Sequence, residues 1–398
     1  MKFNICILGL FLILFSCNRK KIVNEKFGQL ENKYNLVRTD LKTFELDSLT
    51  ATRVKYSQTL YDVNGKLILT FMNSFDNSIY LYDFYDSRKF MKKIKFEKSG
   101  ENSVKKIGGY FFHSLDSLYV FDELDFNLKL SDTSGRISNN KINIASETQL
   151  KDPFYFLKYP AYPFTTSNAI KKYKNTLLLT GIYPWAINDT MIDKFNITQK
   201  INLEKPTNKN FMHHYPTEIY GKGFYWGDPI FTNVYSTLSS DGKSLIYSFP
   251  VSHNLYVANI EDSSFSPIFA GSNTAKDFDI IDKKFSEKRI NMHNYYLSND
   301  FYANILFDGF KKIYYRFVLR HVENVDYNNS ITDKKLGVIL MDENFKYLGE
   351  STIGSLGEYH WENAFVTEDG LNVEYLDDND FEEKYLKFHT FVPKKNDQ

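Results

Sequence analysis

Short apolar or alternating runs, separated by turn residues, follow one another from Leu41 almost to the C-terminus. Runs of about 4 to 8 residues with this pattern, bounded by Gly, Asn, Asp or Ser, are typical of β-strands. The clearest predicted strands are SIYLYDF (78–84), SLYVFDE (117–123), NTLLLTG (175–181), SLIYSF (244–249), NLYVANI (254–260), KIYYRFVLR (312–320), LGVILMD (336–342), LNVEYLD (371–377) and KYLKFHTFV (384–392). Only residues 276–288 have the pattern of an amphipathic helix. The chain is therefore predicted to be mainly β.

Turn signals recur along the chain at a nearly constant spacing. Each precedes an apolar run, and the six pairs are Asn64-Gly65, Asp116-Ser117, Lys174-Asn175, Asp241-Gly242, Asp308-Gly309 and Asp369-Gly370. The intervals between their first residues are 52, 58, 67, 67 and 61. Recurrence at this scale indicates a repeated β unit, and a four-stranded blade with long loops fits about 60 residues. We therefore predict a β-propeller with six blades of about four antiparallel strands.

Two further observations support blades. Asn64 is followed 13 residues later by Asn77, and Asp241 is followed at the same distance by Asn254, which is the length of one strand plus its return. The segment LKTFELD (41–47) is predicted to join the last blade beside residues 384–392, because ring closure protects sheet edges that would otherwise promote aggregation. A two-domain β-sandwich remains the alternative, since such turn dipeptides occur in any β protein.

The N-terminus combines a short apolar run with a cysteine. The run Ile5–Phe15 has 11 residues, too few to span a bilayer, which takes about 20, but it fits the apolar part of a signal peptide. Leu14 to Cys17 resembles a bacterial lipobox, so cleavage before Cys17 would leave that residue lipidated. The alternative is an ordinary secretory signal in which Cys17 is incidental. We assign residues 1–16 to the signal peptide, 17–40 to the lipidated N-terminus and tether, 41–393 to one propeller domain and 394–398 to a polar tail.

Composition narrows the range of partners. The chain has 398 residues, with 49 basic and 49 acidic side chains, and this balance argues against a nucleic-acid partner. It also has 35 Phe and 29 Tyr, which favour strands because aromatic side chains pack well on a pleated surface. Most of these aromatic residues are expected to pack in the core or across strands, and some could contact carbohydrate or peptide.

Three C-terminal segments carry a family resemblance. Residues 294–321, 338–350 and 365–376 resemble a family of uncharacterised lipoproteins from Bacteroidetes-type bacteria, for which a six-bladed, TolB-like β-propeller is expected. The resemblance implies the fold and the anchor but provides no catalytic residues. Surface-exported lipoproteins of such bacteria tend to carry acidic residues after the cysteine, whereas this chain has Arg19, Lys20 and Lys21. We therefore expect an outer-membrane anchor that faces the periplasm.

The sequence lacks the common catalytic signatures: no HExxH, GxSxG, Walker or EF-hand motif is present. Aromatic loops at 159–164, 183–185, 211–216 and 220–228 are candidates for a recognition face, or they plug blade junctions. The candidate ligand-binding residues are Tyr159, Tyr162, Trp185, His213, His214, Tyr225, Trp226 and Arg316. Neighbouring side chains on a strand point to opposite faces, so His213 and His214 are not expected to share a metal ion. Arg316 lies in an apolar strand and needs acceptors, either along a central channel or on a neighbouring acid.

Two functions follow from these observations. The first is a non-enzymatic binding or scaffold propeller, held to the membrane by its N-terminal lipid, that recognises a peptide, glycan or protein and needs no cofactor or metal. The second is a propeller enzyme, a hydrolase or lyase that acts on glycans.

Overall fold

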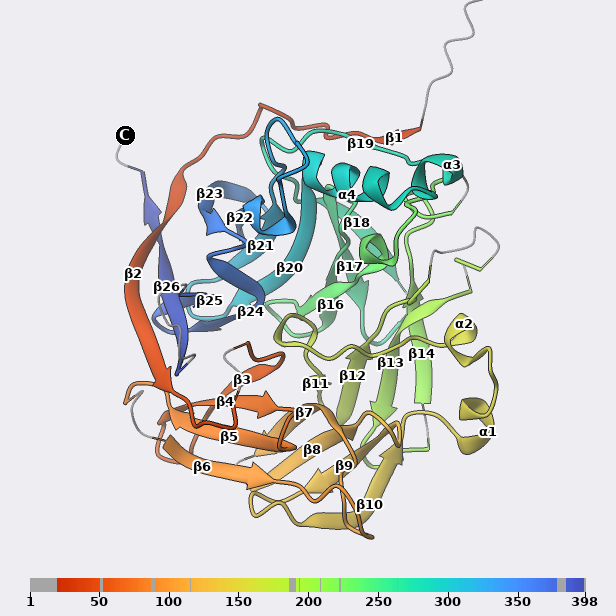
Figure 1. Ribbon diagram of the computed structural model, residues 1–398, viewed down its shortest axis with the longest axis vertical. Coiled ribbons are helices and arrows are strands. Elements are labelled where there is room, and N and C mark those ends of the chain that lie inside the picture. Colours follow the sequence, from red (N-terminus) through yellow and green to blue (C-terminus); the bar gives the residue numbers. More distant parts are fainter. Residues whose placement is uncertain are drawn as a thin grey trace, which may run out of the picture.

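The computed structural model describes residues 20–50, 53–86, 90–114, 116–185, 191–192, 194–207, 209–221, 223–262, 264–377 and 384–396. Six four-stranded antiparallel sheets make up most of this part of the chain. They are arranged as blades around a centre, with the first strand of each blade innermost (Figure 1). The predicted six-bladed propeller is therefore confirmed.

The first four blades take their strands in chain order. Blade 1 contains β3 (Ser57–Tyr61), β4 (Leu67–Asn73), β5 (Ser78–Asp83) and β6 (Phe90–Lys95). Blade 2 contains β7 (Ile107–Ser114), β8 (Ser117–Asp122), β9 (Asn127–Ser131) and β10 (Ile137–Asn143). Blade 3 contains β11 (Lys171–Tyr173), β12 (Thr176–Thr180), β13 (Asn196–Asn202) and β14 (Lys209–His214). Blade 4 contains β15 (Tyr235–Leu238), β16 (Ser244–Ser248), β17 (Asn254–Asn259) and β18 (Phe265–Phe269).

The last two blades close the ring. Blade 5 contains β20 (Phe301–Asp308), β21 (Ile313–Leu319), β22 (Lys335–Asp342) and β23 (Tyr347–Ser355). Blade 6 contains β24 (Tyr359–Thr367), β25 (Gly370–Tyr375), β26 (Tyr385–Lys395) and, as its outermost strand, β2 (Tyr34–Glu45). Leu41 pairs with His389 in the register of β2 and β26. The predicted contribution of residues 41–47 to the last blade is thus confirmed.

All six turn signals lie between the first and second strands of a blade. Gly65 and Gly242 adopt φ values of 77° and 70°, which glycine reaches without steric cost. Asn77 and Asn254 lie where the third strand of their blades begins, which explains their 13-residue distance from the first turn. The spacing in the sequence therefore marks the same position in every blade.

The N-terminal segment differs from the predicted tether. Residues 20–33, which we call the strap, lie across blades 4 and 5 (Figure 1). Two-residue strands β1 (Lys21–Ile22) and β19 (Phe278–Asp279) pair with each other, and Lys33 N donates to Leu348 O at 2.8 Å. From Lys20 onward, the range 17–40 therefore belongs to the folded domain. Backbone hydrogen bonds hold this polar segment, which is why its composition gave no sign of order.

Helices are short and lie in the connections. They are α1 (Glu147–Leu150), α2 (Tyr155–Lys158), α3 (Lys283–Ser286), α4 (Arg289–Ser298) and the 3-10 turns η1 (Thr166–Asn168), η2 (Pro229–Thr232) and η3 (Ile331–Asp333). The helix expected at 276–288 is wrong in its bounds: this range contains the strand β19, and the helical residues are those of α3 (283–286) and α4 (289–298). Asp282 caps α3 by accepting from Phe285 N at 2.8 Å, which sets this start.

Aromatic side chains fill the junctions between blades. At the ring closure, Phe44 of β2 lies 5.8 Å from Tyr82 of blade 1 and 6.1 Å from Phe388 of β26, measured between ring centroids. Both contacts are edge-to-face, the geometry that aromatic pairs prefer. Other ring pairs lie within one blade, such as Phe71 and Tyr80, so packing within and between blades largely explains the high content of Phe and Tyr.

Candidate functional site

The four aromatic loops lie on one face of the ring. We call this the upper face, the face that carries the connections from blade to blade and from the second to the third strand of each blade. Residues 159–164, 215–216 and 220–228 belong to blade-to-blade connections, 183–185 to the β12–β13 connection, and 211–214 to the adjoining end of β14. Because consecutive strands are antiparallel, these segments reach the same face. They surround blade 3.

Most of the candidate aromatic residues in these loops are engaged within the protein. Tyr162 is buried and its hydroxyl donates to Gln199 Oε1 at 3.1 Å, and Trp226 is buried with its Nε1 donating to Ile219 O at 2.9 Å. Tyr159 is half-buried and stacks on Tyr155. These three residues pack against neighbouring loops and against the strands of blade 3.

Tyr225 and Trp185 differ in exposure. The hydroxyl of Tyr225 lies 3.2 Å from Ser286 Oγ, which ties the loop to α3. Trp185 is 55% exposed, so its ring is open to solvent. Trp185 is therefore the predicted aromatic residue that the structure presents for contact.

His213 and His214 do not form a shared metal site. His213 is buried, with Nδ1 2.8 Å from the Tyr247 hydroxyl and Nε2 3.0 Å from Asn259 O. His214 instead directs Nδ1 to Tyr215 O at 2.7 Å. Burial lowers the pKa of His213 despite its hydrogen bonds, so the ring is neutral at pH 7. Among the described residues, no group of three or more His, Cys, Asp or Glu is placed to hold a metal ion.

Arg316 was predicted to lie along the central channel or to pair with a neighbouring acid, and the structure shows a different arrangement. Its guanidinium donates to the carbonyl oxygens of Ser252, His253, Asn254 and Ala270, and to Ser248 Oγ. All these acceptors lie in or beside blade 4, whereas Arg316 lies on β21 of blade 5. The residue is fully buried, and burial lowers its pKa to about 10. Arg316 therefore joins two blades through backbone carbonyls, away from the innermost strands.

The centre of the ring is crossed by η1. This turn packs against β15, β20 and β24, the innermost strands of blades 4, 5 and 6. Thr166 Oγ1 donates to Asn363 Oδ1 at 2.5 Å and accepts from Ser57 N at 2.7 Å. Asn363 Nδ2 in turn donates to Glu374 Oε2 at 3.0 Å. A polar network thus fills the channel at this level.

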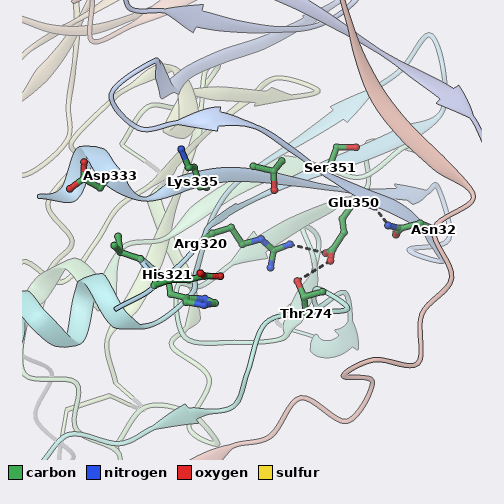
Figure 2. A pocket seen from close by; sticks show the side chains of 11 residues that line it. Asn32, Thr274, Arg320, His321, Asp333, Lys335, Glu350 and Ser351 are labelled. Atoms are coloured by element: carbon green, nitrogen blue, oxygen red, sulfur yellow. Dashed lines mark hydrogen bonds and ion pairs between the residues drawn. The ribbon is translucent and has the colours of Figure 1, made fainter. Parts of the chain in front are cut away.

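A pocket of 590 Å³ lies at the upper end of blade 5 (Figure 2). Parts of the chain that are distant in sequence line it: the strap, the connection after β18, the β21–β22 connection with its flanking residues, and β23. Its lining includes Asn32, Thr274, Arg320, His321, Asp333, Lys335, Glu350 and Ser351. A cavity of this size, with convergent polar groups, is typical of a small-ligand site.

Paired charges form the floor of this pocket. Figure 2 shows Arg320, Glu350 and Thr274 pointing toward one another. Arg320 Nη2 lies 3.1 Å from Glu350 Oε2, and Thr274 Oγ1 donates to Glu350 Oε1 at 3.2 Å. The Arg320–Glu350 contact is an ion pair without hydrogen-bond alignment, since Oε2 is buried with no hydrogen-bond partner. The Arg320 and Glu350 side chains are 13% and 7% exposed, so the pair is shielded from solvent.

Hydrogen bonds hold other parts of the pocket lining, which carries both signs of charge. Asn32 Oδ1 accepts from Glu350 N at 3.2 Å, which joins the strap to β23. His321 Nδ1 lies 3.0 Å from Asp300 Oδ1. Lys335 and Asp333 are exposed beside the Arg320–Glu350 pair, and Arg320 N donates to Lys335 O at 2.7 Å. The arrangement suits a polar ligand that carries a positive and a negative group, such as a peptide.

No pattern in the sequence predicts this pocket. Its lining residues lie between positions 32 and 352, and no local motif joins them. Arg320 ends the predicted strand KIYYRFVLR, but only the folded chain shows that Glu350 and Thr274 meet it. Cys17 lies outside the described residues, so its lipidation stays a prediction. No helix in the described ranges is both long and apolar enough to cross a membrane.

Fold and site together define a six-bladed propeller with a charged pocket on its upper face. Residues 33–352 match the model of the family described as "Domain of unknown function (DUF4221)", and the chain belongs to this family. Comparison with curated proteins gives no match.

Solved structures share the fold. A DUF4221 member from Bacteroides vulgatus ATCC 8482 is similar at a TM-score of 0.76 and 19% identity, over 92% of this chain and 99% of that one. A protein of Bacteroides fragilis NCTC 9343, named as an exported protein, gives a TM-score of 0.51 and 12% identity, over 92% of this chain and 96% of that one. At these identities, the likeness establishes the propeller architecture.

Proposed function

We propose that this chain is an envelope lipoprotein that binds a peptide-like ligand in the pocket at Arg320 and Glu350. The pocket itself carries the proposal, because a preformed cavity with a shielded ion pair and exposed charges of both signs matches the termini of a short peptide. Binding loses less conformational entropy when the side chains of the site are already ordered before the ligand arrives.

The anchor in this proposal is a lipid on Cys17. The lipobox-like Leu14–Cys17 segment and the name of the exported relative from B. fragilis support an envelope location. The basic residues Arg19–Lys21 favour an outer-membrane anchor that faces the periplasm. The pocket would then be accessible to solutes of the periplasm.

Thermal unfolding in the presence of ligand libraries tests the binding function. We expect members of a tripeptide library to raise the Tm of the wild-type protein, and members of a neutral oligosaccharide library to leave it unchanged. Lys335→Glu, which reverses an exposed charge in the pocket, should abolish the shift. Lys346→Glu is the matched control, because Lys346 is exposed in the β22–β23 turn at the other end of blade 5. A Tm unaffected by every tripeptide would contradict the proposal.

The anchor has its own test. Cys17→Ala should move the protein from the membrane fraction to the soluble envelope fraction, and protease added to intact cells should leave the wild type uncut. Retention of Cys17→Ala in the membrane would contradict the lipid anchor. Digestion of the wild type on intact cells would contradict the periplasmic orientation.

Glycan hydrolysis or elimination is the second candidate function, and one cluster favours it. His360 on β24 lies between Glu374, 2.7 Å from Nδ1, and Glu362, 3.7 Å from Nε2. Two carboxylates beside a histidine could serve acid–base chemistry. Glu374 is almost fully buried, however, and also accepts from Asn363, so the cluster is engaged in the channel network. Oligosaccharide cleavage that disappears in Glu362→Gln would establish the enzyme instead.

A further inference from the structure

The strap begins at the rim of the ring, beside α3 and α4 (Figure 1). Ile22 pairs with Phe278, and Ile280 N donates to Lys20 O at 3.5 Å. Lys21 Nζ forms an ion pair with Asp277 at 2.6 Å, and Asn24 N donates to the same carboxylate at 2.8 Å. The first described residues are therefore fixed to one edge of the propeller.

This attachment limits where a lipid on Cys17 can lie. Two residues, Asn18 and Arg19, separate Cys17 from Lys20, so the chain takes three steps between them, each of at most about 3.5 Å when extended. The acylated cysteine must then lie within about 10 Å of Lys20. The inference rests on the proposed lipidation, and given that lipidation, the bilayer surface has to lie next to this edge.

The same edge has the chemistry of a membrane-contacting surface. We call residues 20–27 and 276–290 the basic rim. It contains eight Lys or Arg and five Asp or Glu, a net charge of +3 in a chain whose total charge is zero. Four large apolar side chains on it are exposed, namely Val23 (50%), Phe27 (50%), Phe285 (39%) and Ile290 (59%). Apolar side chains interspersed with lysines are typical of surfaces that lie on anionic lipid.

The two parts of the rim lie together. Lys21, Phe27, Lys276 and Asp279 border a common surface hollow of 450 Å³. Tyr295 of α4 donates to Asp279 O at 2.7 Å, and Asn291 Nδ2 donates to Phe285 O at 2.9 Å. The strap, β19 and the two helices thus form one continuous surface.

We propose that the basic rim lies on the anionic headgroups of the membrane that holds the lipid of Cys17. The acyl chains provide the attachment, and the rim fixes the orientation of the propeller on the bilayer. Because the strap also contributes Asn32 to the pocket, this contact sets the position of the pocket relative to the membrane.

Site-specific fluorescence quenching on vesicles tests this orientation. The mature lipoprotein would contain no free thiol, because cleavage removes Cys6 and the sulfur of Cys17 carries the lipid as a thioether. A fluorophore on Ile290→Cys can therefore be placed alone, in lipidated protein reconstituted into vesicles that contain about one-third phosphatidylglycerol and a headgroup nitroxide. Val63→Cys is the control, because Val63 is 93% exposed in the β3–β4 turn of blade 1, across the ring from blade 4.

We expect at least threefold stronger quenching at position 290 than at position 63. The combined change Lys283→Glu, Lys284→Glu and Lys288→Glu should reduce the quenching at 290 at least twofold, while Lys92→Glu with Lys95→Glu on β6 should leave it unchanged. If the protein floats with the vesicles but quenching is equal at positions 290 and 63, the lipid anchor stands and the contact between the basic rim and the membrane is wrong. Protein that fails to float would overturn the lipid anchor, and this inference with it.

Discussion

The guanidinium of Arg316 lies 3.8 Å from the ring centroid of Tyr302, so that it stacks on the ring while its nitrogens face the carbonyls of blade 4. Tyr302 also connects the two blades, because its hydroxyl lies 2.8 Å from His253 Nδ1 and accepts from Ser272 N at 2.9 Å. A planar cation with five donors can stack and donate at once, which a lysine cannot. The pair therefore locks blade 5 to blade 4.

Arg316→Met is predicted to lower the free energy of unfolding by about 3 kcal/mol or more, since it leaves several buried carbonyls without donors. Arg316→Lys should recover little of this loss. Urea denaturation followed by tryptophan fluorescence measures the effect. Arg136→Met is the control, because the Arg136 side chain is 80% exposed, and it should change stability by less than about 0.5 kcal/mol. Equal stabilities of the two Met variants would contradict the blade-joining role.

The blade architecture could be predicted from sequence because each blade repeats the same turn before its second strand. Asn64, Asp241 and Asp369 are local signals, and ring closure followed from the strand pattern at 41–47. The strap escaped prediction, because Asn24 and Lys33 are ordered by backbone and amide hydrogen bonds to residues more than 240 positions away. The role of Arg316 could not be predicted either. Most of its acceptors are backbone carbonyls, which every residue has, so the residue types in the sequence do not identify them. Sequence therefore predicted what is local or repeated, and the pocket is neither.

Gly349 allows β2 to pass against blade 5. A Cβ at this position would overlap the backbone of Tyr34, whose carbonyl oxygen cannot move without displacing β2. Gly349→Ala should therefore lower stability by about 1 to 3 kcal/mol and release the strap to added protease. Gly309→Ala serves as the control, since the nearest atom to its Cβ would lie 3.9 Å away, in Phe307. A strap that stays resistant to protease in Gly349→Ala would show that β2 adjusts without cost.

Thr166 holds η1 across the channel. Thr166→Val keeps the shape of the side chain but removes the hydrogen bonds to Asn363 and Ser57, so a loss of about 2 kcal/mol is expected for the unpaired buried groups. The measurement is urea denaturation. Thr332→Val is the control, because that hydroxyl bonds to Ser330 on the surface. If both variants are as stable as the wild type, water replaces the lost partners in the channel.

His360 should make the free energy of unfolding decrease as the pH rises from 6.5 to 9. Burial of the ring lowers its pKa, but the interactions with Glu362 and Glu374 outweigh burial and raise the pKa to about 9. A histidine with a raised pKa stabilises the fold fully below its unfolded value of about 6.5, and this contribution is lost as pH rises through 9. At about 1.4 kcal/mol per pH unit across that window, the loss amounts to about 3 kcal/mol.

The free energy of unfolding of the wild type should therefore fall between pH 6.5 and pH 9, and His360→Gln should flatten that slope. His113→Gln, which replaces an exposed ring, should keep the slope of the wild type. Urea titrations at pH 6.5, 7.5 and 9 give the three profiles. Parallel profiles for the wild type and His360→Gln would mean that Glu374 does not hold a charged imidazole, and the channel network would then rest on Asn363 and Thr166 alone.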